Sequence, residues 1–267
     1  MRVIVEFDMY SRLGNRMFQY AFGYLLAKKY NCNLYCKGDL PNFGIKGNSN
    51  FVNFDNQIEN TSDQIIYTRH GGAQYFDFNA LENFDGDVVV NSWLQKADYY
   101  TEHRELLREL FDIQKLEPVN KDCLVLHVRG GDYITIGCHL DYRFYKRLID
   151  HTKFTKVAIV TDDPNCDTVR RLVNDGCQVL TPEPAPFNVN GDVNAMNDLK
   201  TLLYSENIAI SQSSFAWWAA FLGYHKKVII PFSTDLDTLM WHIDPQQDDI
   251  DLCYDDPGVV EKYIHQK

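Results

Sequence analysis

Side chains able to bind an anion gather where an apolar run gives way to glycine, serine or aspartate. The clearest case follows the apolar run that ends at Val128, where Arg129, Gly130, Gly131 and Asp132 come next. A guanidinium fork matches phosphate oxygens, and glycines allow a backbone to approach a ligand closely. The segment predicts a diphosphate site. A Gly-Gly turn in which Arg129 pairs with Asp132 explains the same residues.

Two adjacent carboxylates, Asp162 and Asp163, follow the next apolar run, which ends at Thr161. Such a pair can hold a divalent cation, accept hydrogen bonds from ribose hydroxyls, or cap the following helix. Local residue types favour the cap and turn. Residues 85–87 and 235–237 have the Asp-x-Asp spacing of a metal motif, but such triplets are common in an acidic chain. We interpret both as turns, and we predict no metal site.

A third turn carries Ser213 and Ser214, directly before the aromatic and alanine-rich run 215–220. Serines at this position either cap a helix or present hydroxyl and amide groups to an anion. We expect Ser213 and Ser214 to contact a phosphate, because they follow a strand. We expect Trp217 and Trp218 to belong to the core.

A fourth turn, residues 11–21, follows the first apolar run and contains Gly14 and Asn15. Asn15 either caps the helix that begins here or faces a ligand cleft. The same segment carries Arg16, a second cation near a strand end.

The elements that must position these turns alternate between short apolar runs and helical patterns. In the first half we expect strands at 3–7, 33–36 and 88–90, loops and short strands over 37–83, and helices at 17–30 and 97–111. Glu117, Pro118 and Asn120 then interrupt the pattern. The sequence therefore predicts two domains, residues 1–118 and 119–267.

The second half has a regular strand–helix rhythm. We expect strands at 123–128, 157–161, 178–180, 208–211 and 228–230, helices at 142–151, 166–175, 195–204 and 215–224, and an irregular acidic tail after Ser233. This alternation is typical of an α/β fold with a doubly wound parallel sheet. Ligands bind outside the carboxyl ends of such strands, so the turns after Val128, Thr161 and Ser211 are the candidate site.

Composition narrows the class of protein. The chain has 267 residues, 45% of them hydrophobic, and a formal net charge of -11. An acidic surface repels phosphate polymers, which argues against nucleic acid as a partner. No run of about 18 apolar residues predicts a membrane span, and no secretory signal is visible. The 7 cysteines are scattered, which favours reduced thiols and a cytoplasmic location. Nothing in the sequence indicates an oligomeric state.

The four turns resemble those of the α-1,2-fucosyltransferase family (glycosyltransferase family 11-like) and, more distantly, the α-1,6- and protein O-fucosyltransferases. The Gly14-Asn15 turn with residues 17–21, and the run 213–220, carry the resemblance. It implies a GT-B architecture of two facing Rossmann-like domains, the first on the acceptor side and the second binding the donor. It also implies GDP-fucose as donor, a galactoside hydroxyl as acceptor, inversion at the anomeric carbon, and no required metal or other cofactor.

The resemblance also implies roles for particular residues. Arg129 matches the arginine that holds the β-phosphate, and Asn15 matches a residue that reaches the reaction centre. Asp132 is a candidate base, with pairing to Arg129, or proton transfer to the departing diphosphate, as the alternatives. His127 and Asp198 match positions that contact guanine. The full set of expected donor-binding residues is His127, Arg129, Gly131, Asp162, Asp163, Asp198, Ser213, Ser214 and Phe215.

The chain departs from the family pattern at the diphosphate turn. Arg-Arg-Gly-Asp is the usual order, whereas this chain has Arg129, Gly130, Gly131 and Asp132. Arg16 stands where the family has glutamine, and it is a candidate to replace the missing charge. Two alternatives follow from the lost arginine: a GT-B transferase that uses another nucleotide sugar, or a catalytically weak sugar-nucleotide-binding protein.

Overall fold

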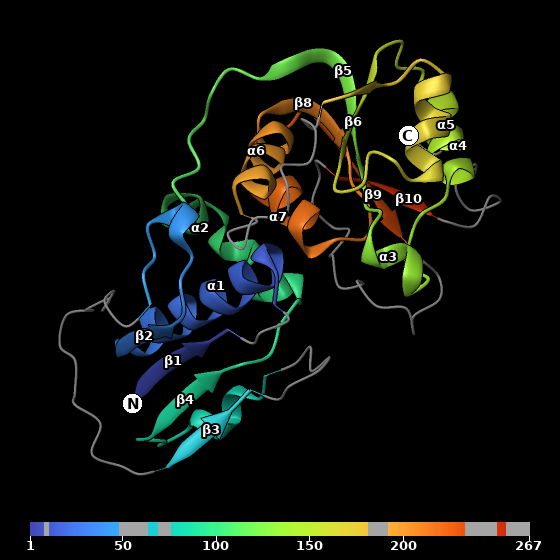
Figure 1. Cartoon of the computed structure of the whole chain (residues 1–267). Helices are drawn as coiled ribbons and strands as arrows, with labels where there is room; N and C mark the ends of the chain where they lie inside the picture. The colour runs from blue at the N-terminus through green and yellow to red at the C-terminus, as the bar shows by residue number, and fades with distance from the viewer. Residues whose placement is uncertain (8–10, 48–63, 69–75, 181–191, 233–249, 255–267) are drawn as a thin grey trace. The chain divides into compact units, whose positions relative to one another are not determined.

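The computed structural model describes residues 1–7, 11–47, 64–68, 76–180, 192–232 and 250–254. The chain divides into two compact units, Met1–Asp112 and Ile113–Lys267 (Figure 1). The sequence-based boundary at Pro118 falls slightly later, because residues 113–118 form neither helix nor strand and lead directly into the second unit.

The first unit contains a four-stranded parallel sheet in the order β2-β1-β4-β3. Helix α1 (Leu13–Tyr30) connects the first two strands and packs on β1, β2 and β4. A Cβ atom added at Gly23 would lie 2.4 Å from Cγ2 of Val5, so the helix lies unusually close to the sheet. The strands are β1 (Arg2–Glu6), β2 (Asn33–Lys37), β3 (Ile65–Tyr67) and β4 (Asp87–Val90).

The helix expected over 97–111 is confirmed only in its second half. Two 3₁₀ turns, Ala97–Tyr99 and Thr101–His103, precede a short helix α2 (Arg104–Leu110). Tyr100 is fully buried between these turns, and its hydroxyl donates to the carbonyl of Leu94 at 2.8 Å. The buried Tyr100 ring thus lies at the point where the expected helix is replaced by 3₁₀ turns. Two other 3₁₀ turns, Pro41–Phe43 and Phe78–Leu81, lie within the expected loop region.

The second unit contains a six-stranded parallel sheet in the order β10-β9-β8-β5-β6-β7. Strands β6 and β7 follow β5 on one side of it, and strands β8, β9 and β10 are then added on the other side. The strand order therefore reverses between β5 and β8, which is the topological switch point of the sheet. The strands are β5 (Val119–Val128), β6 (Val157–Thr161), β7 (Gln178–Val179), β8 (Ser205–Ala209), β9 (Lys227–Phe232) and β10 (Ile250–Tyr254).

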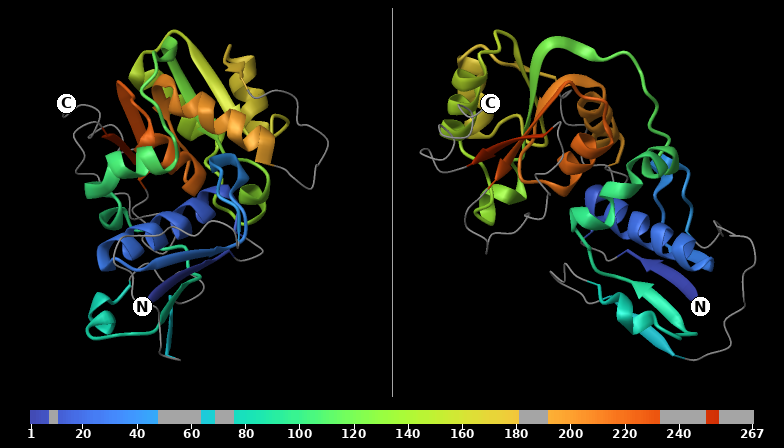
Figure 2. Two further views of the ribbon diagram at one scale, coloured as in Figure 1. Left: turned by 90° about the vertical axis from the view of Figure 1, so that its left-hand side faces the viewer. Right: turned by 180° about the vertical axis from the view of Figure 1, so that it is seen from behind.

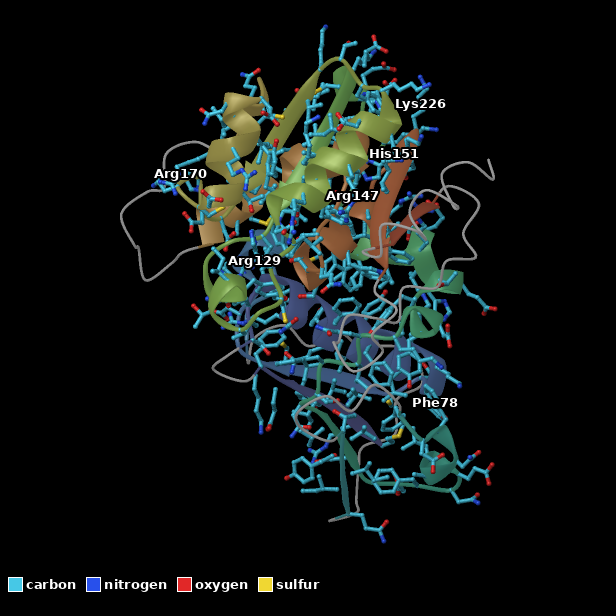
Figure 3. All side chains as sticks on the ribbon, turned by 90° about the vertical axis from the view of Figure 1, so that its right-hand side faces the viewer. Phe78, Arg129, Arg147, His151, Arg170 and Lys226 are labelled. Atoms are coloured by element: carbon cyan, nitrogen blue, oxygen red, sulfur yellow. The ribbon has the colours of Figure 1, made fainter. Side chains whose placement is uncertain are left out.

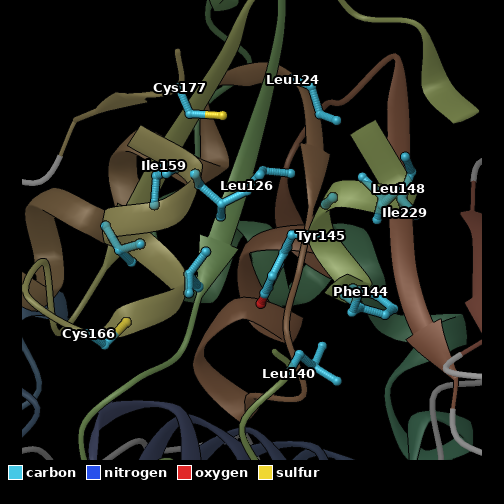
Figure 4. Close-up of a cluster of buried hydrophobic side chains, with 14 residues drawn as sticks. Leu124, Leu126, Leu140, Phe144, Tyr145, Leu148, Ile159, Cys166, Cys177 and Ile229 are labelled. Atoms are coloured by element: carbon cyan, nitrogen blue, oxygen red, sulfur yellow. The ribbon is translucent and has the colours of Figure 1, made fainter. Parts of the chain in front are cut away.

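Helices cover both faces of this sheet (Figure 2). Alternate side chains of β5, including Leu124 and Leu126, pack with α4 and α5 in one buried hydrophobic cluster (Figure 4). The opposite face is covered by α6 and α7, where Trp217 and Trp218 are buried as predicted. The helices are α3 (Asp132–Thr135), α4 (Tyr142–Thr152), α5 (Asp167–Asn174), α6 (Asp192–Leu203) and α7 (Ser214–Leu222).

Two elements of the second unit, α3 and β10, were not expected, and the bounds of several others differ from those predicted. The short helix α3 was not expected, and β8 ends at Ala209 rather than at Ser211. The tail expected to be irregular contributes the edge strand β10, whose Ile250 pairs with Val228 of β9. Strand pairing of this kind depends on a distant partner and is weakly marked in the local sequence.

Candidate functional site

Two of the predicted site residues of the second unit, His127 and Phe215, lie together at the switch point between β5 and β8. His127, near the end of β5, points to the face covered by α7. Its Nδ1 lies 2.7 Å from Oγ of Ser211, just beyond β8, and its ring centroid lies 5.8 Å from that of Phe215. The fold thus brings His127, Ser211 and Phe215 together, as the strand-end rule predicts.

His127 is buried, with 4% of its surface exposed. Burial lowers the pKa of its imidazole to about 3, and the positive charge of Arg129 adds to the effect. The ring is therefore neutral near pH 7 and offers one donor and one acceptor nitrogen. The backbone at this position is held from α4, because the Tyr145 hydroxyl donates to the His127 carbonyl at 3.0 Å.

We expect His127 to make the protein less stable in acid. An unfolded histidine binds a proton near pH 6.5, whereas folded His127 does so only near pH 3. Between these values the unfolded state binds more protons, so the free energy of unfolding falls as the pH falls, by up to about 1.4 kcal/mol per pH unit. His127→Asn should make this dependence shallower by up to one proton, measured by urea unfolding between about pH 4 and 7.

The matched control is His103→Asn, because His103 is an exposed histidine of the first unit. That variant should keep the wild-type dependence. Equal slopes for wild type and His127→Asn would show that His127 titrates normally in the folded protein.

Arg129 lies at the exit of β5, beside the loop that carries α3 (Figure 3). Its Nη2 donates to Oδ1 of Asp132 at 2.7 Å, and its Nη1 forms an ion pair with Asp162. The guanidinium also lies 5.0 Å from the ring centroid of Tyr133. Only 14% of the Arg129 side chain is exposed. The structure thus contains the Arg129–Asp132 pair that the sequence allowed. Together with Asp162, this pair fixes the orientation of a partly buried guanidinium.

The two adjacent carboxylates have different partners. Oδ1 of Asp162 accepts from the backbone N–H of Gly130 at 2.7 Å and so joins the ends of β5 and β6. Asp163 closes a local turn, because its Oδ1 accepts from the N–H of Asn165 at 3.1 Å. The turn explanation therefore holds for Asp163, whereas Asp162 belongs to the Arg129 cluster.

The two glycines have geometric reasons to be glycine. A Cβ atom at Gly130 would lie 2.8 Å from Cβ of Asp163, so a larger residue there requires Asp163 to move. Gly131 has a φ of +49° and a Cβ atom there would lie 2.9 Å from Oδ2 of Asp162. In this chain the close approach of the two strand ends leaves no room for an arginine at Gly130 unless Asp163 moves.

Ser213 is the N-cap of α7, but its side chain makes no capping hydrogen bond. Its carbonyl accepts from the N–H of Trp217 at 2.8 Å, and Ser214 begins the helix. The first turn holds no acidic residue. Backbone N–H groups at a helix N-terminus can donate to an anion. Asp198 lies partly exposed on α6, the helix that packs against α7.

In the first unit, Asn15 lies in the first turn of α1, where Arg12 rather than Asn15 is the N-cap. Oδ1 of Asn15 accepts from Nε2 of Gln95 at 2.8 Å. Arg16 donates from Nε to the carbonyl of Ser11 at 2.8 Å, and its guanidinium lies 5.6 Å from the ring centroid of Phe7. The polar residues that follow β1 and β4 thus meet at the corresponding end of this sheet.

Sequence reasoning missed Gln95 and His139. Gln95 contacts a partner 80 positions away, and no local pattern marks it. His139 contacts both the backbone of Arg129 and the side chain of Thr168, as described below. A lone histidine or glutamine in a loop carries no spacing signal, so only the tertiary structure identifies these residues.

The acidic triplet at residues 85–87 has structural partners. Asp85 accepts from the N-terminal amine at 3.1 Å, and Asp87 pairs with Arg2 at 2.7 Å. Residues 235–237 lie outside the described residues. In the described ranges, no group of three or more His, Cys, Asp or Glu side chains is arranged to hold a metal ion. Among the helices that the structure describes, none has the length and apolar character needed to cross a bilayer.

Comparison with known proteins adds a relative and a fold. No profile of a known protein family matches the chain. The chain is 22% identical, over 250 residues, to an α-1,2-colitosyltransferase of Escherichia coli, covering 79% of this chain and 84% of the relative. This relative and the structures below agree with the resemblance carried by the four turns.

Two solved structures have a similar fold. One is the NodZ α-1,6-fucosyltransferase soaked with GDP-fucose, with a TM-score of 0.53, 14% identity, and coverage of 85% of this chain and 94% of that one. The other is NodZ co-crystallised with GDP, with a TM-score of 0.51, 12% identity, and coverage of 85% and 93%. The chain therefore has a GT-B-like α/β fold with parallel sheets, as the resemblance implied.

Proposed function

We propose that this chain is an inverting glycosyltransferase that moves L-fucose from GDP-fucose to a galactoside hydroxyl in α-1,2 linkage. The relative named for α-1,2 sugar transfer and the fold shared with an α-1,6-fucosyltransferase support the reaction class. The carrying observation is Arg129, a partly buried cation at the carboxyl end of β5, beside the switch point.

In this proposal the second unit binds the donor. The Arg129 guanidinium contacts the β-phosphate, since its fork matches phosphate oxygens. Ser213, Ser214 and the N-terminus of α7 supply further donors to the diphosphate, and Gly131 lets the backbone come close. Neutral His127 and the ring of Phe215 face the nucleoside. Asp198 reads guanine, because a carboxylate accepts from both N1–H and the exocyclic amine.

The reaction is a single displacement. The acceptor hydroxyl oxygen forms a bond to the anomeric carbon while the bond from that carbon to the β-phosphate oxygen breaks, and GDP leaves. Arg129 stabilises the negative charge that develops on the leaving diphosphate. The hydroxyl proton passes to Asp132 or to the diphosphate itself. The proposal also gives two residues of the first unit a part in the reaction, Asn15 as a catalytic residue and Arg16 as a helper.

We also propose that the reaction proceeds in the cytoplasm. It needs no metal ion, because Arg129 and the N-terminus of α7 supply the positive charge that a metal ion otherwise gives. In this proposal both carboxylates lie beside the nucleoside. Asp162 positions the Arg129 guanidinium, and Asp163 stabilises the turn after β6. Full activity in the presence of EDTA is the expected result.

Two measurements test the proposal. Thermal unfolding with GDP, UDP, ADP and CMP should show stabilisation by GDP alone, by about 2.7 kcal/mol at 100 times the dissociation constant. Incubation with GDP-fucose and a panel of galactosides should then release GDP only when an acceptor is present. No response to any nucleotide would exclude the proposal, and binding of GDP without turnover would instead favour a sugar-nucleotide-binding protein.

The named relative supports a second candidate, transfer of a different sugar from a nucleotide donor. It predicts stabilisation by the nucleotide that the donor carries, but no transfer from GDP-fucose. Activity with a nucleotide-linked colitose, tested side by side with GDP-fucose on the same acceptors, separates the two.

A further inference from the structure

The peptide group between Arg129 and Gly130 is held from both sides. Its carbonyl oxygen, on Arg129, lies 2.6 Å from Nδ1 of His139. Its N–H, on Gly130, donates to Oδ1 of Asp162 at 2.7 Å. One peptide plane carries both contacts, so its orientation is set by two side chains from different parts of the chain.

His139 uses both ring nitrogens. A carbonyl oxygen only accepts, so Nδ1 of His139 carries the hydrogen and donates to Arg129. Nε2 then accepts from the Thr168 hydroxyl, which lies 2.8 Å away on helix α5. Thr168 is buried, with 4% of its surface exposed. The ring therefore connects the exit of β5 to a buried position on a neighbouring helix.

The loop that His139 closes is largely exposed. Residues 131–132 and 134–137 are exposed, whereas His139 is half-buried and Leu140 is buried. The loop carries Asp132 and Tyr133, which contact the Arg129 guanidinium. The hydrogen bond from His139 to Arg129 thus joins the two ends of the loop that surrounds the guanidinium.

We propose that His139 is a positioning residue for donor binding, which acts by fixing the Arg129–Gly130 peptide and so the direction of the Arg129 side chain. This inference rests on the proposed function, since it gives His139 a role in holding the donor diphosphate. A reacting or binding group displaced by about 1 Å costs about 100-fold in rate. Loss of the peptide clamp is expected to act on this scale.

Two isosteric substitutions separate the contacts. In His139→Asn the amide nitrogen is as far from Cβ as Nδ1 is, so it reaches the Arg129 carbonyl. In His139→Gln the amide nitrogen instead falls near the position of Nε2, so it reaches Thr168. Both variants remove the imidazole, and only the first keeps the proposed function of the residue.

The experiment measures the GDP dissociation constant by calorimetry and kcat/KM for the donor, on the full chain. We expect His139→Ala and His139→Gln to weaken GDP binding about tenfold, as for one lost hydrogen bond, and to lower kcat/KM about 100-fold. His139→Asn should restore GDP binding to near the wild-type value. In an Arg129→Ala background, His139→Gln should have no further effect on GDP binding.

Different outcomes overturn different claims. If the wild-type protein does not bind GDP, the proposed function fails. If it binds GDP and the asparagine and glutamine variants behave alike, or if His139→Gln still weakens binding without Arg129, the positioning role fails. If His139→Ala does not fold, the asparagine and glutamine pair decides the question.

Discussion

Arg129→Ala is expected to reduce sugar transfer by about 100- to 1,000-fold, which is the usual cost of removing one donor that stabilises developing negative charge. The reason lies in the geometry of the residue. Arg129 is 14% exposed and held by two carboxylates, so the protein sets the position of its guanidinium in a partly dry site, where charge interactions are strong. The measurement is kcat/KM for GDP-fucose, together with the GDP dissociation constant.

The control for this prediction is Arg170→Ala. Arg170 belongs to the same unit, lies exposed on α5, and pairs with Asp167 at 3.6 Å. Such an exposed pair contributes little, so the variant should keep wild-type turnover and stability. Arg129→Lys should retain part of the activity, because lysine keeps the charge but not the fork. Wild-type turnover in Arg129→Ala would mean that the donor binds elsewhere.

Trp218→Ala is expected to destabilise the second unit by about 3–5 kcal/mol, the usual cost of truncating a buried aromatic side chain. Trp218 has 0% of its surface exposed, and its ring packs edge-on against Trp217 and Phe221 at 5.0 and 5.9 Å. The same helix presents the Ser213 end to the switch point. Truncation of its core face should therefore lower both stability and GDP affinity.

Calorimetry should resolve this loss as a fall of about 10 °C in the transition of the second unit, since 1 kcal/mol corresponds to roughly 2–4 °C at this size. Trp218→Phe should cost less, because most of the cavity stays filled. Leu116→Ala serves as the surface control, since Leu116 is 52% exposed and should change stability by no more than about 0.5 kcal/mol. A transition unchanged by Trp218→Ala would contradict the buried packing of α7.

Much of the fold follows from local patterns. The strand and helix alternation after Val119, with apolar runs that end in polar turns, is enough to predict a parallel sheet and the edge where Arg129 and Asp162 lie. The two glycines at the Arg129 turn predict a close backbone approach to a ligand, whereas the structure shows the side chains of Asp163 and Asp162 beside them. The strand and helix alternation and the position of the polar turns depend on residues within a few positions of one another.

Other features depend on partners far along the chain. Gln95 meets Asn15 across 80 positions, and Ser211 meets His127 across 84. Three further features also depend on distant segments. They are the contact of Arg129 with Asp162 rather than Asp163, the burial of Tyr100, and the pairing of β10 with β9.

By itself, then, the sequence determined which residues stand at the carboxyl ends of strands, because hydrophobic periodicity and turn residues are local properties of a chain. The tertiary structure alone decided which of those residues touch, and that His139 holds the peptide beside Arg129. The physical reason is that a side-chain contact requires two segments to pack together, and the free energy of that packing comes from the whole core rather than from either segment.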